Sequence, residues 1–377
     1  MRINPSELYD ILAREGIDFF TGVPDSTLKH FCFYLDDYSD PSNHIITANE
    51  GNSIALAAGY HISTGKIPLV YMQNSGLGNA INPLTSLVGN DLFAIPMLVM
   101  VGWRGEPGKK DAIQHSKDGQ MQLQLLETLG LSYTIIPSAT KSLELQIQDS
   151  IRLAKDKESP HVILVRKDAF EKYKSRKSNN ANNHSMSREY VLTKIFNAIK
   201  PGSIIISTTG KTSRELYEIR KELGKLDSID LMLVGSMGHA SSLSLGVALE
   251  NKNRNIFCID GDGSLIMHMG ALSTIGKYSP SNFRHILLNN FSHDSVGGQE
   301  SSSDIIDFNA LSKAVSYNNY FEISEKSDFG KTFSDFQESL GPSFLEILIS
   351  KGSRPDLSRP DLTPYQNKKE FMDFLGL

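Results

Sequence analysis

The stretch Asn255-Ile-Phe-Cys-Ile-Asp-Gly-Asp-Gly263 decides the fold together with Arg284-His-Ile-Leu-Leu-Asn-Asn290, whose two asparagines begin 26 residues after Gly263. Each pattern predicts a buried strand, and the first strand is expected to run into a tight turn. An acid at the tip of one strand and an amide at the tip of its neighbour can share one divalent cation. Mg²⁺ takes oxygen ligands in a near-octahedral shell and usually carries phosphate oxygens in it.

The spacing therefore predicts a site for Mg²⁺ and a phosphate group at Asp262 and Asn290. Gly261 and Gly263 would let the backbone approach that phosphate closely. The alternative is two unrelated turns. The helix-like segment Ser264–Gly276 between the paired strands argues against it.

Apolar strand-like runs alternate with helical patterns along the chain, in two halves. In the first half we expect strands at Phe19–Phe20, Ile45–Ala48, Leu69–Met72, Met97–Val101, Tyr133–Ile136 and Val162–Val165. In the second half we expect them at Ser203–Ser207, Leu231–Val234, Asn255–Ile259, His285–Leu288, Tyr320–Ile323 and Phe344–Ile349. Continuous apolar strands in this order favour parallel sheets covered on both faces.

The sequence thus predicts an α/β protein with two doubly wound parallel-sheet domains of similar architecture, although no residue-level repeat is visible. The polar segment Lys172–Met186 is expected to link a domain 1–171 to a domain 187–377. The second domain ends in a tail with a last helix at Pro364–Phe374. At the other end, Asn4 and Pro5 predict the start of a helix that ends near Gly16.

Size and composition indicate a soluble enzyme of two or three domains, because the chain has 377 residues and 40% of them are hydrophobic. Its two cysteines favour a reducing cytoplasm over a compartment where disulfides form. The net charge of −5 argues against nucleic acid as a partner. The longest apolar run, Phe93–Val101, is too short to span a membrane, and we see no signal-peptide pattern at the N-terminus. Cys32 and Cys258 are expected to pack as small hydrophobic residues.

A second candidate site lies in the first half. Glu50 is expected at the end of the strand-like run from Ile45, before a helix of small residues, Gly51–Tyr60. A carboxylate there can bind a ligand. Alternatively, it supports the N-terminus of the helix electrostatically.

The Gly-Asp-Gly and Asn-Asn pair resembles the diphosphate-anchoring motif of thiamine-diphosphate enzymes. The resemblance covers nearly the whole chain and implies thiamine diphosphate and Mg²⁺ as cofactors. It implies Asp262, Asn290 and the Ser292 carbonyl as metal ligands, and places Gly261, Gly263 and Ser264 at the diphosphate. It also implies a pyrimidine-binding and a diphosphate-binding domain, without the middle domain of larger relatives.

The same resemblance assigns roles to two further places. Glu50 would protonate N1′ of the aminopyrimidine. In Val234-Gly-Ser-Met-Gly-His-Ala240, the Gly235 carbonyl would accept a hydrogen bond from the 4′-amino group, and Met237 would wedge beneath the thiazolium. Met237 taken alone is more often a core residue. Because the family binds its cofactor between subunits, a homodimer is implied as the minimum active unit.

Other segments are similar to those of the decarboxylases of phosphonopyruvate and sulfopyruvate: 22–26, 73–79, 102–108, 208–214 and 293–299. This implies the non-oxidative decarboxylation of 3-phosphonopyruvate to phosphonoacetaldehyde and CO₂, through a C2 carbanion and an enamine. A multiply charged anionic 2-oxo acid needs cations around it. The candidates are Arg104, Lys109, Lys110, Lys211 and Arg214, each of which could instead be a solvated surface charge.

Proton transfer to and from the product needs an acid and a base, for which Asp25, His115 and His293 are candidates. Asp25 could instead cap a helix, and His115 could be merely exposed. Decarboxylation of sulfopyruvate or another 2-oxo acid stays an alternative, as does a non-catalytic cofactor-binding protein. Two nucleotide-binding patterns are incomplete. The P-loop pattern that ends at Lys211-Thr212 lacks its first glycine, and the dinucleotide-binding pattern from Gly76 has Ile81 in place of its third glycine.

Overall fold

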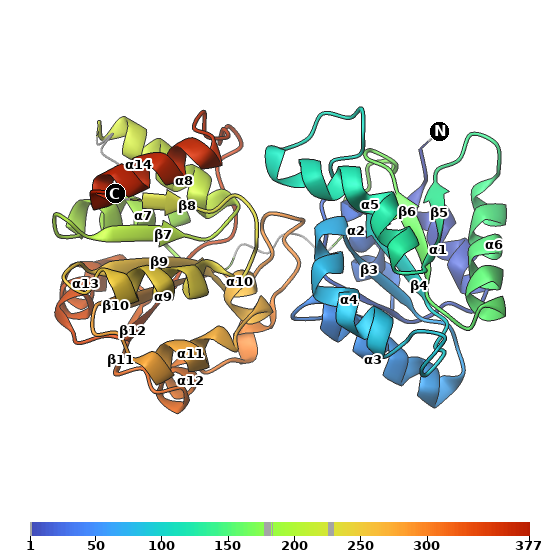
Figure 1. Cartoon of the computed structure of the whole chain (residues 1–377), viewed down its shortest axis with the longest axis horizontal. Coiled ribbons are helices and arrows are strands. Elements are labelled where there is room, and N and C mark those ends of the chain that lie inside the picture. The colour runs from blue at the N-terminus through green and yellow to red at the C-terminus, as the bar shows by residue number, and fades with distance from the viewer. Residues whose placement is uncertain (1, 177–181, 183, 225–229) are drawn as a thin grey trace. The chain divides into compact units, whose positions relative to one another are not determined.

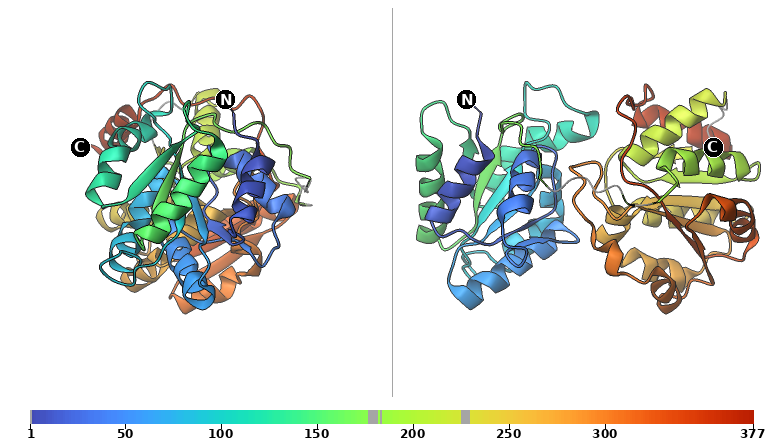
Figure 2. Two further views of the ribbon diagram at one scale, coloured as in Figure 1. Left: turned by 90° about the vertical axis from the view of Figure 1, so that its right-hand side faces the viewer. Right: turned by 180° about the vertical axis from the view of Figure 1, so that it is seen from behind.

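The computed structural model describes residues 2–176, 182, 184–224 and 230–377. The chain divides into two compact units, Met1–Asn180 and Ala181–Leu377 (Figure 1), which we call the N-terminal and the C-terminal unit. Each unit is a parallel β-sheet with helices on both faces (Figure 2). The predicted α/β class with two doubly wound sheets is therefore confirmed.

The N-terminal sheet has six strands in the order β2-β1-β3-β4-β6-β5, and all neighbours are parallel. All six strands expected from the sequence are present, with ends that differ by at most two residues. The strands are β1 (Phe20–Gly22), β2 (His44–Ile46), β3 (Leu69–Gln73), β4 (Leu98–Gly102), β5 (Ser132–Ile136) and β6 (His161–Val165).

Six α-helices cover this sheet: α1 (Pro5–Arg14), α2 (Lys29–Tyr38), α3 (Glu50–Thr64), α4 (Leu77–Ser86), α5 (Ser116–Thr128) and α6 (Leu143–Asp156). Their apolar faces bury two separate cores. One core contains residues of α1, α2 and α6, and the other contains residues of α3, α4 and α5. The start of α1 is as predicted, because the Asn4 side chain accepts a hydrogen bond from the Ser6 N–H at 3.0 Å and Pro5 is the first helical residue.

The C-terminal sheet has the order β11-β12-β10-β9-β7-β8, again with every neighbour parallel. Its strands are β7 (Ile204–Ser207), β8 (Asp230–Met232), β9 (Ile256–Gly261), β10 (Phe283–Asn289), β11 (Asn319–Ile323) and β12 (Ser343–Leu348). Numbered within each unit, both sheets run second, first, third, fourth, sixth, fifth from edge to edge. The prediction that the two halves share one architecture is confirmed.

The helices of the C-terminal unit also bury one core on each face of the sheet. They are α7 (Arg188–Ala198), α8 (Lys211–Glu222), α9 (Ala240–Glu250), α10 (Asp262–Met267), α11 (Ala271–Tyr278), α12 (Phe308–Ala314), α13 (Phe329–Glu338) and α14 (Pro364–Leu375). The expected single helix Ser264–Gly276 is wrong. His268 leaves helical geometry at φ −132° and ψ 43°, so a turn at 268–270 separates α10 from α11.

The boundary between the units, Asn180–Ala181, falls within the segment expected as a linker. Residues 177–181 and 183 of that segment lie outside the described residues. Its two ends pack on the units themselves. The Tyr173 hydroxyl donates to Asp37 at 2.8 Å in the N-terminal unit, and Met186 is fully buried in the C-terminal core.

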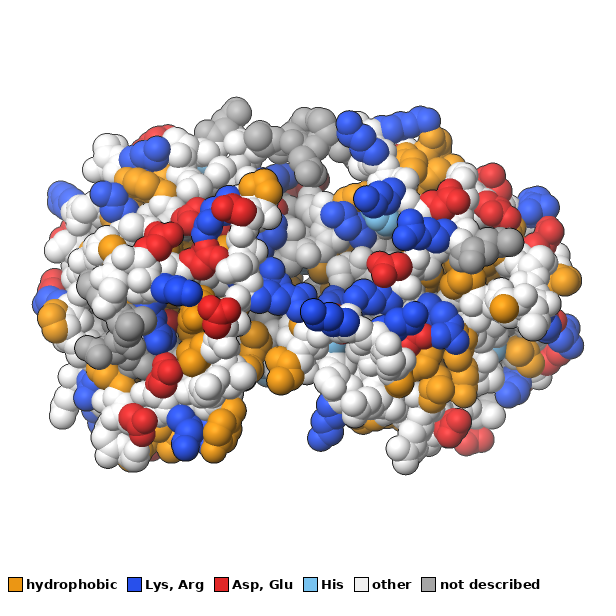
Figure 3. Space-filling model, turned by 90° about the horizontal axis from the view of Figure 1, so that it is seen from above, with side chains coloured by type: hydrophobic (Ala, Val, Ile, Leu, Met, Phe, Trp, Pro, Cys, Tyr) orange, Lys and Arg blue, Asp and Glu red, His pale blue; other side chains and the backbone are white. Residues whose placement is uncertain are grey.

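Both cysteines, Cys32 and Cys258, are buried and free, as predicted. On the face that Figure 3 shows, each unit carries both acidic and basic side chains. Among the described residues, we find no helix with the length and apolar character needed to cross a bilayer.

Candidate active site

The candidate residues gather where strands end. Asp25 follows β1, Glu50 follows β2, Arg104 follows β4, Asp262 follows β9 and Asn290 follows β10. In open parallel sheets, ligands bind outside the carboxyl ends of the strands, at the point where the strand order reverses. In the C-terminal unit this point lies between β7 and β9, so Asp262 stands directly beside it.

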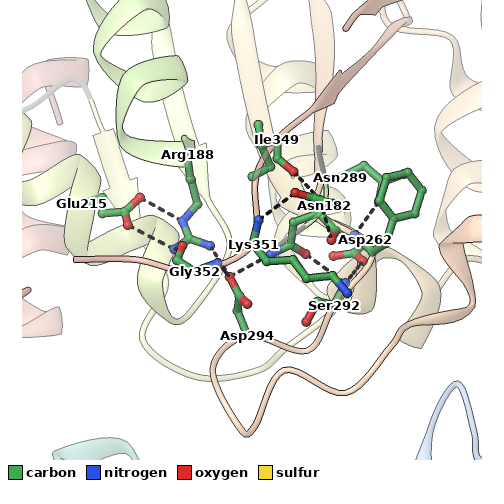
Figure 4. Close-up of polar contacts among 12 residues, drawn as sticks. Asn182, Arg188, Glu215, Asp262, Asn289, Ser292, Asp294, Ile349, Lys351 and Gly352 are labelled. Carbon is green, nitrogen blue, oxygen red and sulfur yellow. Dashed lines mark hydrogen bonds and ion pairs between the residues drawn. The ribbon is translucent and has the colours of Figure 1, made fainter. Parts of the chain in front are cut away.

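Asp262 and Asn290 meet at one backbone group. The Ser292 N–H donates to Asp262 Oδ2 at 2.9 Å (Figure 4). It also donates to Asn290 Oδ1 at 3.0 Å. The two side chains come from neighbouring paired strands, and their oxygens turn toward the same small region. The structure therefore brings together the two residues that the sequence predicts as metal ligands.

The surroundings of Asp262 fit a hard divalent cation. Its Oδ2 also accepts hydrogen bonds from the hydroxyls of Ser301 and Ser303, so Oδ1 is the oxygen that a cation would take. Burial raises the pKa of Asp262, and these hydrogen bonds oppose the rise. The Ser292 hydroxyl oxygen is buried without a hydrogen-bond partner among the described residues. Carboxylate and amide oxygens such as those of Asp262 and Asn290 suit Mg²⁺.

The two glycines of the motif differ in their surroundings. A Cβ on Gly261 would meet no heavy atom within 4 Å, so its backbone is open to a phosphate group. A Cβ on Gly263 would lie 2.8 Å from the His293 ring and 3.4 Å from Met237 Cε. Gly263 is thus needed because His293 packs on it. The expected tight turn is absent here, since α10 begins directly at Asp262.

The loop that contains Gly235 and Met237 is tied to the same place. The Ser264 hydroxyl accepts a hydrogen bond from the Gly238 N–H at 3.0 Å and lies 2.8 Å from the Thr208 hydroxyl at the end of β7. Ser264 therefore joins three segments that are distant in sequence. Together with the contact of Met237 at Gly263, this brings the expected wedge residue next to the diphosphate motif.

Glu50 is the first residue of α3, not the last of a strand, because β2 ends at Ile46 and Asn49 caps the helix. Its side chain is buried, and its Oε2 accepts a hydrogen bond from Asn79 Nδ2 at 2.8 Å. A Cβ on Gly76 would lie only 2.3 Å from Glu50 Oε1, so glycine is required there. Burial raises the pKa of Glu50, opposed by the Asn79 bond, which favours a carboxyl group that can hold a proton.

The two carboxylate oxygens of Asp25 differ in their hydrogen bonding. Oδ2 accepts hydrogen bonds from the backbone N–H of Thr27 at 2.7 Å and of Leu28 at 3.1 Å, as in the capping alternative. Oδ1 is buried and has no hydrogen-bond partner among the described residues. Burial raises the pKa of Asp25, and the charge of Arg104 opposes the rise. Capping and proton transfer are therefore compatible at this residue.

Arg104 already has an anionic partner within the N-terminal unit. Its Nε and Nη2 bind Asp111 at 2.8 and 2.6 Å, and its Nη1 donates to the Ser26 hydroxyl at 2.7 Å. Burial would raise the pKa of Asp111, but the hydrogen bonds from Arg104 hold it well below its usual range. No sequence pattern predicts this ion pair, which compensates the charge expected to face a phosphonate.

The remaining candidates differ in exposure. Lys109 and Lys110 are exposed, whereas Lys211 is half-buried at the first turn of α8. His115 is not merely exposed, which was the alternative to a role in proton transfer: it is buried at the end of a short 3₁₀ helix. His293 packs on Gly263, and burial lowers its pKa to about 4, so its ring is neutral at pH 7.

A further cluster of possible metal ligands lies in the core, not at a strand end. Cys258, Asp260 and His285 are fully buried, and their ligand atoms lie within 4.8 Å of one another. Burial raises the pKa of the Cys258 thiol well above its usual value, which disfavours the thiolate that a metal needs. His285 Nδ1 lies 3.0 Å from the Tyr317 hydroxyl. We interpret the cluster as a polar element of the core.

Some residues of the site could not be singled out beforehand. Asn79, Ser301 and Ser303 bind the key carboxylates, yet they lie 29, 39 and 41 residues away along the chain. Their signal in the sequence is slight, since polar residues in glycine- or serine-rich loops are common.

Comparison with known proteins agrees with this geometry. The model of the thiamine pyrophosphate (diphosphate) enzyme N-terminal TPP binding domain matches residues 6–125, and that of the C-terminal TPP binding domain matches residues 208–347. Phosphonopyruvate decarboxylase of Streptomyces viridochromogenes is 31% identical over 99% of this chain and 95% of its own length. Sulfopyruvate decarboxylase of Methanosarcina acetivorans is 28% identical over 100% of this chain and 98% of its own.

Two shorter relatives are separate subunits of one enzyme. Sulfopyruvate decarboxylase subunits beta and alpha of Methanococcus maripaludis are 30% and 35% identical to 49% and 43% of this chain, each over 95% of its own length. The sulfopyruvate decarboxylase of this organism thus has two kinds of subunit. The full-length similarity and both domain matches lead to one conclusion: the chain belongs to the family of thiamine pyrophosphate enzymes that includes the phosphonopyruvate and sulfopyruvate decarboxylases.

Proposed function

We propose that this chain catalyses the non-oxidative decarboxylation of 3-phosphonopyruvate to phosphonoacetaldehyde and CO₂, with thiamine diphosphate and a divalent cation. The observation that carries the proposal is the convergence of Asp262 and Asn290 on the Ser292 N–H. The full-length relative named phosphonopyruvate decarboxylase supports the substrate.

The C-terminal unit would hold the cation and the diphosphate. Asp262, Asn290 and the Ser292 carbonyl would bind the cation, and the open backbone at Gly261 would meet the diphosphate, with Ser264 beside it. Met237 would support the thiazolium ring, and the Gly235 carbonyl would take the aminopyrimidine hydrogen bond. When bound, thiamine diphosphate supplies a nucleophilic carbon and takes up the electron pair that CO₂ leaves behind.

In the N-terminal unit, Glu50 would hold the proton that the aminopyrimidine N1′ needs. The raised pKa favours its protonated form, and the bond from Asn79 fixes one carboxyl oxygen while leaving the other for the ligand. A buried carboxyl with few partners is suited to proton exchange with a bound base.

Asp25 is our candidate for the acid that protonates the product carbon. Its Oδ1 lacks a hydrogen-bond partner in the described structure, and burial raises its pKa, so a proton on that oxygen is favoured. His293, with a pKa of about 4, is neutral and would act as a base or as a neutral donor, not as an imidazolium acid. His115, four residues after Asp111 in the sequence, is buried and stays a third candidate for proton transfer.

For the phosphonate, Lys211 is our first candidate because of its place at the start of a helix, and Arg104 is the second. Lys211 begins α8, where backbone N–H groups and the helix dipole also favour an anion. Arg104 is compensated by Asp111, although a bound phosphonate could still accept a hydrogen bond from its guanidinium edge. Lys109 is exposed, so it would contact the phosphonate only from the solvent side.

We further propose a homodimer in which each cofactor contacts the N-terminal unit of one chain and the C-terminal unit of the other. Large apolar side chains are exposed on the N-terminal unit, at Leu56 and Ile62 of α3 and at Leu92 and Phe93 after α4. Exposed apolar residues of this size suit a subunit interface. Analytical ultracentrifugation would test the dimer, and a monomer that retains full activity would refute it.

The substrate is tested by CO₂ release from phosphonopyruvate, sulfopyruvate and pyruvate, each with thiamine diphosphate and Mg²⁺. We expect phosphonopyruvate to give the highest kcat/KM. A preference for sulfopyruvate would support the second candidate function, which the full-length relative from Methanosarcina acetivorans favours. Cofactor binding without CO₂ release from any of the three would indicate a non-catalytic binding protein.

A further inference from the structure

An amide can bind a cation only through its oxygen, so the orientation of Asn290 matters for the proposed metal site. In the structure, Asn290 Nδ2 donates to Asp294 Oδ2 at 2.8 Å, while Oδ1 accepts from the Ser292 N–H. An ionised carboxylate accepts hydrogen bonds and donates none. Asp294 can therefore pair with the NH₂ group of Asn290 but not with its oxygen.

Asp294 is itself held in place from two sides (Figure 4). The Gly352 N–H, in the segment after β12, donates to the same Oδ2 at 2.9 Å, and Arg188 Nη1 lies 3.6 Å from it. Arg188 is in turn fixed by Glu215 through bonds of 2.8 and 3.1 Å. The Arg188 and Glu215 side chains are only 7% and 2% exposed, and that of Asp294 is 10% exposed.

We propose that Asp294 is a positioning residue that turns the Asn290 oxygen toward the metal. This inference rests on the proposed function, because it requires the metal to bind at Asp262 and Asn290. Without the carboxylate, only the Ser292 N–H would favour this orientation, so the flipped amide, whose NH₂ group would face the cation, would be populated more often. Partners that orient metal ligands in this way are as much part of a site as the ligands.

The experiment measures the affinity for Mg²⁺ at a fixed, saturating thiamine diphosphate concentration, by isothermal titration calorimetry. Asp294→Ala should weaken Mg²⁺ binding by about 10- to 100-fold, the usual effect of losing such a partner. Asp294→Asn should retain the fold but weaken binding by about tenfold, because its NH₂ group can pair with the wrong end of Asn290. Asp335→Ala, which removes an exposed carboxylate from α13, is the matched control and should bind Mg²⁺ normally.

A second pair of variants separates orientation from general stability. Asn290→Asp presents an oxygen to the metal in either orientation, so adding Asp294→Ala to it should cause no further loss of Mg²⁺ affinity. A loss in the Asn290→Asp background as large as in the wild-type background would overturn the proposal, since Asp294 would then act on the site by another route. Unchanged Mg²⁺ affinity in Asp294→Ala alone would overturn it as well.

Failure of the proposed function would look different. If the wild-type chain bound neither Mg²⁺ nor thiamine diphosphate, the function would fail before any variant was compared. If the wild type bound both and Asp294 had no effect, only the positioning role would be lost. Neither measurement depends on decarboxylation.

Discussion

The two units share one strand order but differ in the residues that follow their third and fourth strands. In the N-terminal unit, β3 and β4 lead to Asn74 and Arg104, and Asn74 binds the Arg104 backbone with both amide atoms: Oδ1 accepts from N–H at 3.1 Å and Nδ2 donates to the carbonyl at 2.9 Å. In the C-terminal unit, β9 and β10 lead to Asp262 and Asn290, whose oxygens face one shared N–H.

This difference shows how one fold serves two purposes. The amide of Asn74 uses both its donor and its acceptor to close its end of the sheet. Asp262 and Asn290 keep oxygen lone pairs available, so this sheet end is suited to a cation. Function lies in the residues placed at equivalent ends of the two sheets and not in the strand order.

The second strands provide a similar contrast. After β2 the chain enters α3 with Glu50, whereas after β8 it enters α9 through the loop that carries Gly235 and Met237. The two equivalent places thus carry a buried carboxyl group in one unit and a methionine side chain in the other. The proposed site needs one of each.

The most severe test of the comparison is the loss of Asp262. Asp262→Ala should abolish retention of thiamine diphosphate, because the diphosphate and Mg²⁺ compensate each other's charge and the carboxylate anchors both. Isothermal titration with the cofactor and Mg²⁺ would measure this, with Asp335→Ala as the control. Wild-type affinity in Asp262→Ala would contradict the assignment of the metal site to the C-terminal unit.

The next largest effect should come from Glu50 in the N-terminal unit. Glu50→Gln should still bind the cofactor but exchange its C2 proton on the order of a hundredfold or more slowly, since the proton donor is lost. NMR of quenched hydrogen–deuterium exchange would measure the rate. If the rate stays the same while the cofactor is bound, Glu50 supports the helix and nothing more.

The sequence was sufficient for the architecture. All twelve strands were predicted, because long apolar runs flanked by polar turns are a strong local signal in buried parallel sheets. It also paired Asp262 with Asn290, because the carboxyl ends of adjacent parallel strands lie at one edge. It failed at the helix 264–276, where a turn at His268 interrupts an otherwise helical pattern.

The sequence could not show which partners complete the site. The bonds from Ser301 to Asp262, from Asn79 to Glu50 and from Arg104 to Asp111 depend on how loops fold back on the sheets. Hydrophobic periodicity specifies strands and helices but contains little information on loop geometry. For that reason the sequence does not reveal that Asp111 compensates the charge of Arg104, and the role of Arg104 as a substrate contact stays a prediction.

The substrate contact can now be tested at Lys211. Lys211→Ala should lower kcat/KM for phosphonopyruvate by about 10- to 100-fold, since a charge-assisted hydrogen bond is worth roughly 1.5–3 kcal/mol. Turnover of pyruvate, which lacks the phosphonate, should not change. Lys221→Ala is a matched control because Lys221 lies on the same helix and is 63% exposed. Equal losses for both substrates would assign Lys211 to the cofactor or to the fold.

Arg104 should act on stability more than on substrate choice. Arg104→Ala removes two bonds to Asp111 and leaves that carboxylate, only 7% exposed, without its main partner. We expect a loss of about 2–3 kcal/mol in the free energy of unfolding of the N-terminal unit. Urea unfolding followed by Trp103 fluorescence reports on this unit, because Trp103 is the only tryptophan and is buried there. A selective loss of phosphonopyruvate turnover with unchanged stability would restore Arg104 as the substrate contact.

The smallest expected effect is the pH dependence of the free energy of unfolding that a buried histidine of the N-terminal unit causes. His161 on β6 lies 2.9 Å from the hydroxyls of Ser132 and Thr134, and burial, together with the charge of Lys157, lowers its pKa from 6.5 to about 4. Below pH 6.5 the unfolded chain binds a proton at this residue and the folded chain does not. Stability is therefore lost as the pH falls from about 6.5 to about 4, and the loss attributable to His161 between pH 7 and pH 5 is about 1.5–2 kcal/mol.

Asp25 and Glu50 have raised pKa values and contribute with the opposite sign, so the wild type must be compared with a variant at each pH. His161→Gln should remove this part of the pH dependence of Trp103-detected unfolding. His293 has a similarly lowered pKa but lies in the C-terminal unit, where Trp103 does not report. If His161→Gln leaves the difference between pH 7 and pH 5 unchanged, the imidazole is not held neutral in the sheet, because a neutral buried histidine must contribute this slope.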